Sequence, residues 1–412
     1  MRRMNQPRDP AVAQLAWRAR ASTSGRPLLG GGGPGLAALG LAACAPPEPP
    51  AGGKPELKLP KDLSATEKTV AWANWTAYLD VNEETNKHDS LEAFIAETGI
   101  LATYSEDIDD NDSYVSKIRP QLQATPPQDI KRDIITLTDW MANRMIRDQL
   151  VQPLELIHIP NAGRLLEPLK DVSFDPGRQY SLTWQSGFAG IGYDKSKVGR
   201  ELKSLKDLWA DDLKGRITVL SEFRDTVGLI MLSQGVDISG TFTKEQVAAG
   251  MDEVTKRVAD GNIRRIKGNA YMEDLKSGNA IAGIVWSGDI SILRAETEND
   301  NWEFVIPDSG GTLWSDNMMI PMTSTHRRNA HKLMDFYYRP DIAAQVAAYV
   351  NYICPVTGAQ EEMKKIDPEL ADSPLIFPTA QWIAEHNVKG FRALAAAEDE
   401  EYSRMWAKVV GN

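Results

Sequence analysis

The sequence predicts an α/β fold in which a parallel sheet is flanked by helices. From residue 69 onward, short apolar segments typical of strands alternate with amphipathic segments of helical period. The chain has 412 residues, 42% of them hydrophobic and 25% charged, which is enough for two domains that each have a core. Aromatic or acidic residues also follow directly after several expected strands, where open α/β sheets place their ligand sites.

The first part of the domain sequence contains three expected strands and two expected helices. Residues 70–74 form a short apolar strand, and residues 90–98 form an amphipathic helix that ends at a glycine. A second strand is expected around 101–104 and a third at 133–137, followed directly by a helix at 139–147.

The alternation continues in the second part of the chain. Strands are expected at 188–193, 217–220 and 280–286, because each segment is a short apolar run. Helices are expected at 226–233 and 244–259.

Two further segments are less regular or more polar. Residues 150–160 contain repeated prolines, so we expect irregular structure there. Residues 379–410 are expected to be helical, with 398–402 as a solvated acidic face.

The N-terminal 43 residues have a different composition from the rest of the chain. They contain six arginines and one acidic residue, and residues 27–43 are uncharged and rich in Gly, Ala and Leu. We interpret residues 1–43 as an export signal, with the secretory and twin-arginine routes both open. The signal ends in Leu41-Ala42-Ala43-Cys44, which resembles a bacterial lipoprotein box with Cys44 as the lipidated residue. Residues 44–66 are then a flexible tether.

The charge balance limits the classes of partner. Removing residues 1–43 from a chain with 46 basic and 57 acidic residues leaves 40 and 56, a net charge of about −16. An acidic surface disfavours nucleic acid and attracts cations.

The cysteines and the apolar segments limit the structure further. With Cys44 lipidated, Cys354 is alone and no disulfide framework exists. No apolar run of about 18 residues follows the signal, so we expect no membrane-spanning segment.

Two short segments place a carboxylate two or three residues after an indole, namely Trp286 to Asp289 and Trp314 to Asp316. An ammonium group can lie over the face of an indole while a carboxylate neutralises its charge. Similar combinations occur in three other segments, which contain Trp75 and Tyr78, Asp139 and Trp140, and Glu222 and Asp225. If these segments converge, they form a cage for an amine.

These segments resemble motifs of the spermidine/putrescine-type binding proteins of bacterial ABC importers, in the same order over residues 69–412. The matching motifs are Asn74-Trp75-Thr76-Ala77-Tyr78, Ser204-Leu205-Lys206-Asp207-Leu208-Trp209, Tyr271-Met272, Ile284-Val285-Trp286, Gly310-Gly311-Thr312-Leu313-Trp314-Ser315-Asp316 and Phe336-Tyr337-Tyr338-Arg339-Pro340-Asp341. Two positions differ from the pattern: Ala77 replaces an acid found in some spermidine binders, and Asp139 is an additional acid.

The resemblance implies a two-lobe, type II periplasmic-binding-protein-like fold, with a sheet flanked by helices in each lobe and the ligand in the cleft between them. It places lobe 1 at residues 67–186 plus 315–358, and lobe 2 at 187–314 plus 359–412. The chain would cross between lobes near Gly187, just after Trp314 and around residues 357–360.

The resemblance also implies the ligand, the partners and the site residues. The ligand would be a polyamine, putrescine or spermidine, which the protein captures for the membrane permease of an ABC importer. We expect a monomer that is lipid-anchored outside the cytoplasmic membrane and needs no cofactor or metal. The implied ligand-binding residues are Trp75, Thr76, Tyr78, Thr138, Trp140, Glu222, Asp225, Trp286, Asp289, Trp314, Asp316 and Tyr352.

Several alternatives stay open at this point. The chain has no H-E-x-x-H, G-x-S-x-G or P-loop motif, and its five histidines lack ligand-like spacing, so we do not expect an enzyme. The adjacent Tyr337 and Tyr338 would suit a ferric-iron binder, although core packing explains them better. Thiamine, an amino acid or another amine are further candidate ligands, and a protein that has lost ligand binding is a non-transport alternative. Glu222 and Asp225 could instead pair with the neighbouring Arg224.

Overall fold

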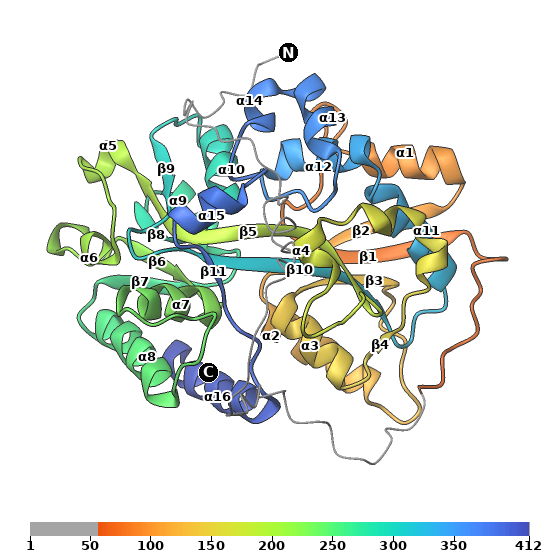
Figure 1. Ribbon diagram of the computed structural model, residues 1–412, viewed down its shortest axis with the longest axis horizontal. Helices are drawn as coiled ribbons and strands as arrows, with labels where there is room; N and C mark the ends of the chain where they lie inside the picture. The colour runs from red at the N-terminus through yellow and green to blue at the C-terminus, as the bar shows by residue number, and fades with distance from the viewer. Residues whose placement is uncertain (1–56, 412) are drawn as a thin grey trace, which may run out of the picture.

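The structure, a computed structural model, describes residues 57–411 of the chain. The expected signal at 1–43, the lipidation site Cys44 and the first part of the tether lie outside the described residues. The structure confirms the expected α/β class, with helices packed around one curved mixed sheet (Figure 1).

The described residues form eleven strands in a single sheet. The strands are β1 Thr69–Trp75, β2 Leu101–Ile108, β3 Ile134–Thr138, β4 Val151–Gln152, β5 Ser181–Asp194, β6 Ile217–Leu220, β7 Ile263–Lys267, β8 Ala282–Trp286, β9 Trp302–Val305, β10 Thr312–Pro321 and β11 Lys389–Gly390. The main path through the sheet is β2-β1-β3-β10-β5-β8-β6-β7; off this path, β4 and β11 pair with β10, and β9 pairs with β5.

The helices cover both faces of this sheet. They are α1 Asp89–Thr98, α2 Asn111–Leu122, α3 Asp139–Arg147, α4 Glu167–Lys170, α5 Lys195–Val198, α6 Leu205–Leu208, α7 Phe223–Ser233, α8 Lys244–Ala259, α9 Tyr271–Lys276, α10 Ser287–Thr297, α11 Arg327–Tyr337, α12 Pro340–Val350, α13 Ala359–Ile366, α14 Pro368–Ala371, α15 Ala380–Glu385 and α16 Ala396–Val410. Three short 3₁₀ turns, η2 Leu156–His158, η3 Pro160–Arg164 and η4 Asp211–Leu213, complete the described elements.

Two long antiparallel strands join the two ends of the sheet. β5 and β10 run side by side through the centre of the molecule (Figure 1), with Gly187 opposite Trp314. We call the part formed by β1, β2, β3 and α1 to α3 the β1 side, and the part formed by β6, β7, β8 and α7 to α10 the β6 side. Within each side the strands are parallel, as expected. The central antiparallel pair makes the whole sheet mixed.

The register of β5 and β10 brings the ends of parallel strands together. Thr138, the last residue of β3, pairs with Asp316 of β10. Trp286, the last residue of β8, pairs with Ala189 of β5. The carboxyl ends of strands from both sides therefore point at the middle of the β5–β10 pair, where ligand sites of open sheets lie.

The largest differences from the expected elements lie in the central strands and the C-terminal helix. β5 is longer than the expected 188–193 because it belongs to both sides of the sheet. A buried strand was expected only before the Trp314–Asp316 segment; β10 continues through this segment to Pro321, although Ser315, Asp316 and Asn317 interrupt its apolar sequence. The expectation of a solvated acidic face at 398–402 is wrong, since Asp399 and Tyr402 are buried.

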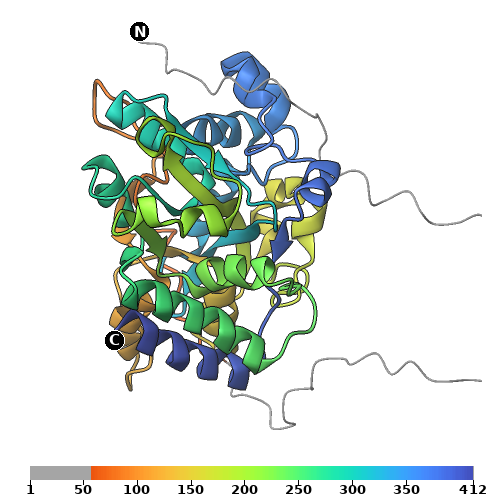
Figure 2. The ribbon, with the colours of Figure 1, turned by 90° about the vertical axis from the view of Figure 1, so that its left-hand side faces the viewer.

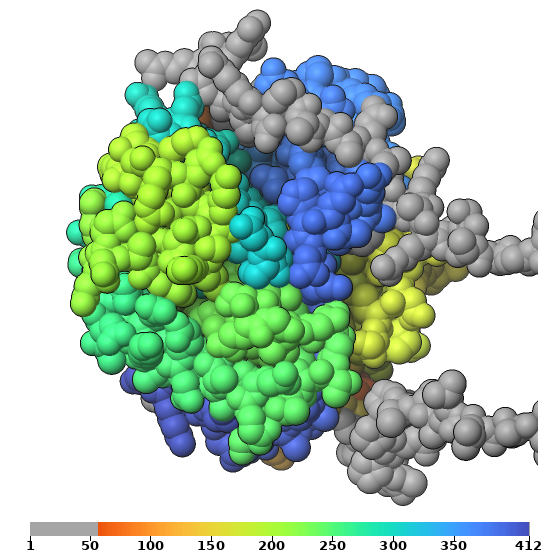
Figure 3. All heavy atoms as spheres, turned by 60° about the vertical axis from the view of Figure 1, so that its left-hand side comes forward, coloured from red at the N-terminus to blue at the C-terminus, as the bar shows by residue number. Residues whose placement is uncertain are grey.

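Helix α16 packs beside α8 on the β6 side of the molecule (Figure 2). In the space-filling view, dark-blue atoms of this C-terminal region emerge below the green atoms of α7 and α8 (Figure 3). Lys244 of α8 pairs with Glu401 of α16 at 2.5 Å, and Trp406 donates from Nε1 to the Ser221 carbonyl at 2.5 Å. These contacts fix α16 to the β6 side.

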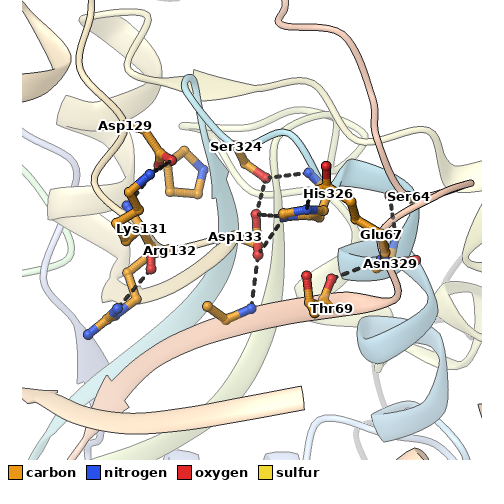
Figure 4. A network of polar contacts seen from close by, with 12 residues as sticks. Ser64, Glu67, Thr69, Asp129, Lys131, Arg132, Asp133, Ser324, His326 and Asn329 are labelled. Atoms are coloured by element: carbon orange, nitrogen blue, oxygen red, sulfur yellow. Dashed lines mark hydrogen bonds and ion pairs between the residues drawn. The ribbon is translucent and has the colours of Figure 1, made fainter. Parts of the chain in front are cut away.

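A polar network anchors the start of the described chain to the β1 side (Figure 4). The His326 ring lies between Asp133, 3.1 Å from its Nδ1, and Glu67, 2.9 Å from its Nε2. Asp133 also accepts hydrogen bonds from Ser324 Oγ at 2.7 Å and from the Ala71 backbone amide at 2.9 Å. Burial alone would lower the pKa of His326, but the hydrogen bond to Glu67 and the charge of Asp133 raise it above the ordinary value.

We expect the stability contribution of His326 to depend on pH. Because its folded-state pKa is raised, the contribution is fully present below about pH 6.5 and is lost as the pH rises through the folded-state pKa. His326→Gln should therefore lower the free energy of unfolding more at pH 6 than at pH 9, as measured by urea denaturation. His386→Gln is the control, because His386 is exposed and its ring contacts only its own helix turn at Trp382. A difference between wild type and His326→Gln that does not change with pH would contradict this account.

Candidate functional site

A cavity with an empty volume of about 400 Å³ lies where the strand ends of both sides meet. Its lining residues come from both sides of the sheet and from β10: Trp75, Thr76, Tyr78, Thr138, Glu222, Asp225, Asn269, Trp286, Asp289, Trp314, Asp316 and Tyr352. The structure thus brings together every residue that the sequence predicted for the site except Trp140.

Asp316 lies at the β1 side of the cavity. Its Oδ1 accepts a hydrogen bond from Thr138 Oγ1 at 2.8 Å, and its Oδ2 accepts one from the Tyr78 hydroxyl at 2.9 Å. Burial raises the pKa of Asp316 to about 7, although the bonds from Thr138 and Tyr78 offset part of that effect. Near neutral pH this carboxyl group is therefore divided between its protonated and ionised forms.

Asp225 is held in a comparable way on the β6 side, in the first turn of α7. It accepts hydrogen bonds from the Trp286 indole Nε1 at 2.9 Å and from Thr312 Oγ1 at 2.7 Å. Burial raises its pKa, and these two bonds lower it in part.

Asp289 and Glu222 each also accept two hydrogen bonds from uncharged groups. The hydroxyls of Tyr271 and Tyr352 donate to Asp289 at 2.6 and 2.7 Å. The Asn111 amide and the Trp140 indole donate to Glu222 at 2.9 and 3.0 Å. Burial raises the pKa of both carboxyl groups, that of Glu222 well above its usual range.

The four carboxyl groups lack basic partners. All four residues are at most 6% exposed, and among the ion pairs of residues 57–411 none involves any of them. The alternative that Glu222 and Asp225 pair with Arg224 is wrong, because Arg224 Nη2 contacts Asp399 at 2.7 Å instead. Buried ionised carboxylates are costly unless a cation compensates them. The site therefore suits an occupant that carries positive charge.

A continuous series of aromatic rings completes the cavity wall. Ring centroids are 6.2 Å apart for Trp75 and Trp286, 6.4 Å for Trp286 and Trp314, and 5.1 Å for Trp314 and Tyr352. Tyr78 continues the series at 5.6 Å from Tyr352. Such rings bury methylene groups and attract cations over their faces.

Two glycines let the Tyr352 ring reach its place. A side-chain carbon on Gly288 would lie 2.8 Å from the Tyr352 ring and 2.5 Å from the Val350 carbonyl oxygen. A carbon on Gly187 would lie 2.4 Å from the Trp314 ring and 2.7 Å from Tyr352. The glycine between Trp286 and Asp289 thus makes room for the tyrosine that donates to Asp289.

Sequence reasoning missed Asn269, which follows the parallel strand β7. Its Nδ2 donates to the Thr76 carbonyl at 3.4 Å, whereas its Oδ1 is buried without a partner in the described residues. Its position directly after a parallel strand could have identified Asn269 as a site residue. The charged sequence of β7, however, is not typical of a strand, so the strand was not predicted.

The one predicted residue outside the lining is Trp140. Its indole stands behind Glu222 and donates to it, and its ring lines a separate cavity together with Asp139. The additional acid noted at Asp139 therefore does not face the first cavity.

The tyrosine pair considered for iron does not belong to the cavity. Tyr337 and Tyr338 are buried, and their hydroxyls contact Ser90 at 3.1 Å and the Thr183 carbonyl at 2.5 Å. Within residues 57–411, no group of three or more His, Cys, Asp or Glu side chains could hold a metal ion. Over the same residues, no helix has both the length and the apolar character needed to cross a bilayer.

Comparison with known proteins gives consistent results. Residues 89–378 match the family described as bacterial extracellular solute-binding protein. The chain is 27% identical over 339 residues to a spermidine/putrescine-binding periplasmic protein of Escherichia coli, covering 81% of this chain and 90% of that protein. It is 24% identical over 364 residues to the putrescine-binding periplasmic protein PotF of Escherichia coli, covering 84% of this chain and 92% of that protein.

A solved structure supports the fold assignment. A putative spermidine/putrescine ABC transporter protein from Listeria monocytogenes superimposes with a TM-score of 0.70 at 26% identity. The match covers 83% of this chain and 99% of the Listeria chain. The expected type II periplasmic-binding-protein-like fold is thereby confirmed.

We expect Asp316 to destabilise the protein when the cavity holds no cation. Its folded-state pKa of about 7 exceeds its ordinary value of 3.8, so ionising it costs folding free energy that grows as the pH rises from 3.8 to 7. Between pH 5 and pH 8, wild type should therefore lose up to about 3 kcal/mol relative to Asp316→Asn. Urea unfolding without added ligand measures this change.

Asp260→Asn, on the exposed end of α8, is the matched control and should show no such pH-dependent gain. If Asp316→Asn and wild type keep the same stability difference at both pH values, the carboxyl group does not titrate near neutrality.

Proposed function

The chain belongs to the family of bacterial extracellular solute-binding proteins, and on this premise we propose that it captures a polyamine, putrescine or spermidine, for an ABC importer. Proteins of this family bind solutes for transport and are not enzymes, in agreement with the absence of catalytic motifs from the sequence. Polyamine-binding relatives that cover most of the chain support this ligand class.

The observation that carries the proposal is the set of four buried carboxyl groups without basic partners. Each is oriented by two uncharged donors, so its ionised form has defined geometry but no counter-charge. A polyamine supplies ammonium groups at fixed intervals along one flexible chain. Its binding would compensate the carboxylates and remove the cost of their burial.

The aromatic wall supports the apolar part of the same ligand. We propose that the methylene groups between the ammonium groups lie against the aromatic walls Trp75, Tyr78, Trp286, Trp314 and Tyr352. Each desolvated cation–π contact would add roughly 0.5–2 kcal/mol. Glu222, Asp225, Asp289 and Asp316 are the proposed counter-charges.

Other polar groups complete the proposed site. Thr76 and Thr138 lie in the lining, and Thr138 orients Asp316. The unpartnered Oδ1 of Asn269 offers an additional acceptor for an ammonium group. Trp140 would act through Glu222 rather than by direct contact.

We propose that the two sides belong to two lobes that close on the ligand. Lobe 1 comprises residues 67–186 plus 315–358, and lobe 2 comprises residues 187–314 plus 359–412. The pairing of Gly187 with Trp314 supports crossings at these positions, because both strands extend into both sides there. A ligand that contacts both lobes stabilises the closed state selectively, and the closed surface is what the permease would recognise.

The proposal extends to the location of the protein. Residues 1–43 would direct export, and lipidation of Cys44 would hold the mature chain at the outer face of the cytoplasmic membrane through the tether at 44–66. We propose that the protein is a monomer in this state.

We expect binding of polyamines in preference to the other candidate ligands. A thermal-shift panel of putrescine, spermidine, spermine, thiamine and ferric citrate should show stabilisation by at least one of the polyamines. In calorimetry, Asp316→Asn should weaken polyamine binding at least tenfold, which corresponds to about 1.4 kcal/mol, because one counter-charge is lost. Asp260→Asn should bind as wild type does. Stabilisation by ferric citrate without any polyamine response would overturn the proposal.

We also expect polyamine affinity to rise with pH across neutrality. Asp316, with a pKa of about 7, must lose its proton before it can pair with an ammonium group, whereas the amine stays protonated in this range. Affinity should therefore fall by up to about tenfold between pH 7 and pH 6. Calorimetry near pH 7 in buffers of different ionisation enthalpy should detect proton release on binding.

In Asp316→Asn both the proton release and the pH dependence should be smaller. If the polyamine affinity of wild type is the same at pH 6 and pH 8, the titration of this carboxyl group is not linked to binding.

A further inference from the structure

The carboxylate of Asp399 connects the two sides of the sheet outside the cavity. Asp399 lies in α16 and is buried. Arg144 of α3, on the β1 side, donates to it from Nε at 2.5 Å and from Nη2 at 2.8 Å. Arg224 of α7, on the β6 side, donates to it from Nη2 at 2.7 Å. We call Arg144, Asp399 and Arg224 the clasp.

The clasp joins the β1 side to the β6 side because α16 is fixed to the β6 side. Trp406 of α16 donates to the Ser221 carbonyl, which directly precedes Glu222. Arg144 is therefore the clasp residue that belongs to the β1 side. Its Nη2 also donates to the hydroxyl of Ser403 in α16 at 2.6 Å.

The same two guanidinium groups stack on Trp140. The Arg144 and Arg224 guanidinium carbons are 4.5 and 4.2 Å from the centroid of the Trp140 ring. The Trp140 indole donates from Nε1 to Glu222 Oε2 at 3.0 Å. A chain of direct contacts thus leads from Asp399 through the arginines and Trp140 to a carboxylate of the cavity.

The electrostatics show what Asp399 contributes. Burial would raise the pKa of Asp399, but the hydrogen bond from Arg144 and the charge of Arg224 outweigh it, and the pKa is lowered. Without this carboxylate, Arg224 would lose its ion partner and would face Arg144, which keeps Asp112 at 2.9 Å, as a like charge beside the Trp140 ring. Removing one partner from a buried ion pair leaves an uncompensated charge and is strongly unfavourable.

We propose that Asp399 is a positioning residue for ligand binding, because the clasp holds the two sides together and fixes Trp140 against Glu222. Asp399 is not among the residues that line the cavity. Its contribution is to the closed arrangement of the two sides, so its loss speeds release of the ligand. The expected effect on ligand release rests on the proposed function, whereas the expected effect on the arrangement of the two sides does not.

The test compares Asp399→Asn with the matched control Glu400→Gln, the next residue of α16, whose exposed side chain pairs only with Arg404 one helical turn away. Two quantities are measured: the dissociation rate of spermidine or putrescine, followed by stopped-flow tryptophan fluorescence, and the radius of gyration of the unliganded protein, from small-angle X-ray scattering.

In Asp399→Asn we expect dissociation at least tenfold faster than in wild type and a larger radius of gyration without ligand. Glu400→Gln should match wild type in both. Asp399→Glu, which keeps the negative charge, should recover part of both properties, whereas a loss of helix packing alone would not be rescued in this way. Wild-type dissociation and wild-type radius in Asp399→Asn would overturn the proposal.

Two further variants keep the outcome decisive. If Asp399→Asn does not fold, Arg144→Gln removes the hydrogen-bonded β1-side partner and leaves the Asp399–Arg224 pair and the longer contact of Arg147 with Asp399 at 3.8 Å. This variant should show the same two changes, and their absence would equally overturn the clasp. As a comparison, Asp316→Asn should bind the polyamine more weakly than wild type but should have the same radius of gyration without ligand. If wild type binds no polyamine, the proposed function fails, and the radius of the Asp399 and Arg144 variants still decides on the clasp.

Discussion

The burial of four carboxyl groups without basic partners is the constraint on which the rest of this structure depends. Asp225, Asp289, Asp316 and Glu222 are each fixed by two uncharged donors, and these donors come from nearly every element around the cavity. The tryptophan and tyrosine side chains thus have two roles. Their rings form an apolar wall, and several of their N–H and O–H groups orient the acids behind it.

The sheet makes this arrangement possible by directing parallel strands from both sides toward one place. In most open sheets the strand ends of a single parallel set form the site. Here two sets face each other across the β5–β10 pair, so residues at or just after the ends of β1, β3, β6, β7 and β8 converge. The absence of a side-chain carbon at Gly187 and Gly288 then lets Trp314 and Tyr352 close the space between the two sets.

Much of the site could be predicted from the sequence, because its residues belong to local patterns. Trp286 and Asp289 follow a recognisable apolar strand, and Trp314 and Asp316 repeat the combination of indole and acid. The position of Trp140 behind Glu222 could not be predicted, since it depends on a contact between residues 82 positions apart. Asn269 was missed because β7 is too polar to be recognised as a strand. The burial of Asp399 depends on two arginines far from it in sequence, so its acidic neighbours made the segment look exposed.

The order of these elements along the chain has a consequence for how the protein is made. β5 pairs with β10, whose partner residues lie more than a hundred positions later, and the Asp399 carboxylate lies 255 positions after Arg144 and 175 after Arg224. Contacts between such distant segments form late in folding, since the loops between them must close first. A chain that is still being synthesised therefore lacks a finished pocket until β10 has left the ribosome, and the two sides can be joined through Asp399 only after that segment has followed.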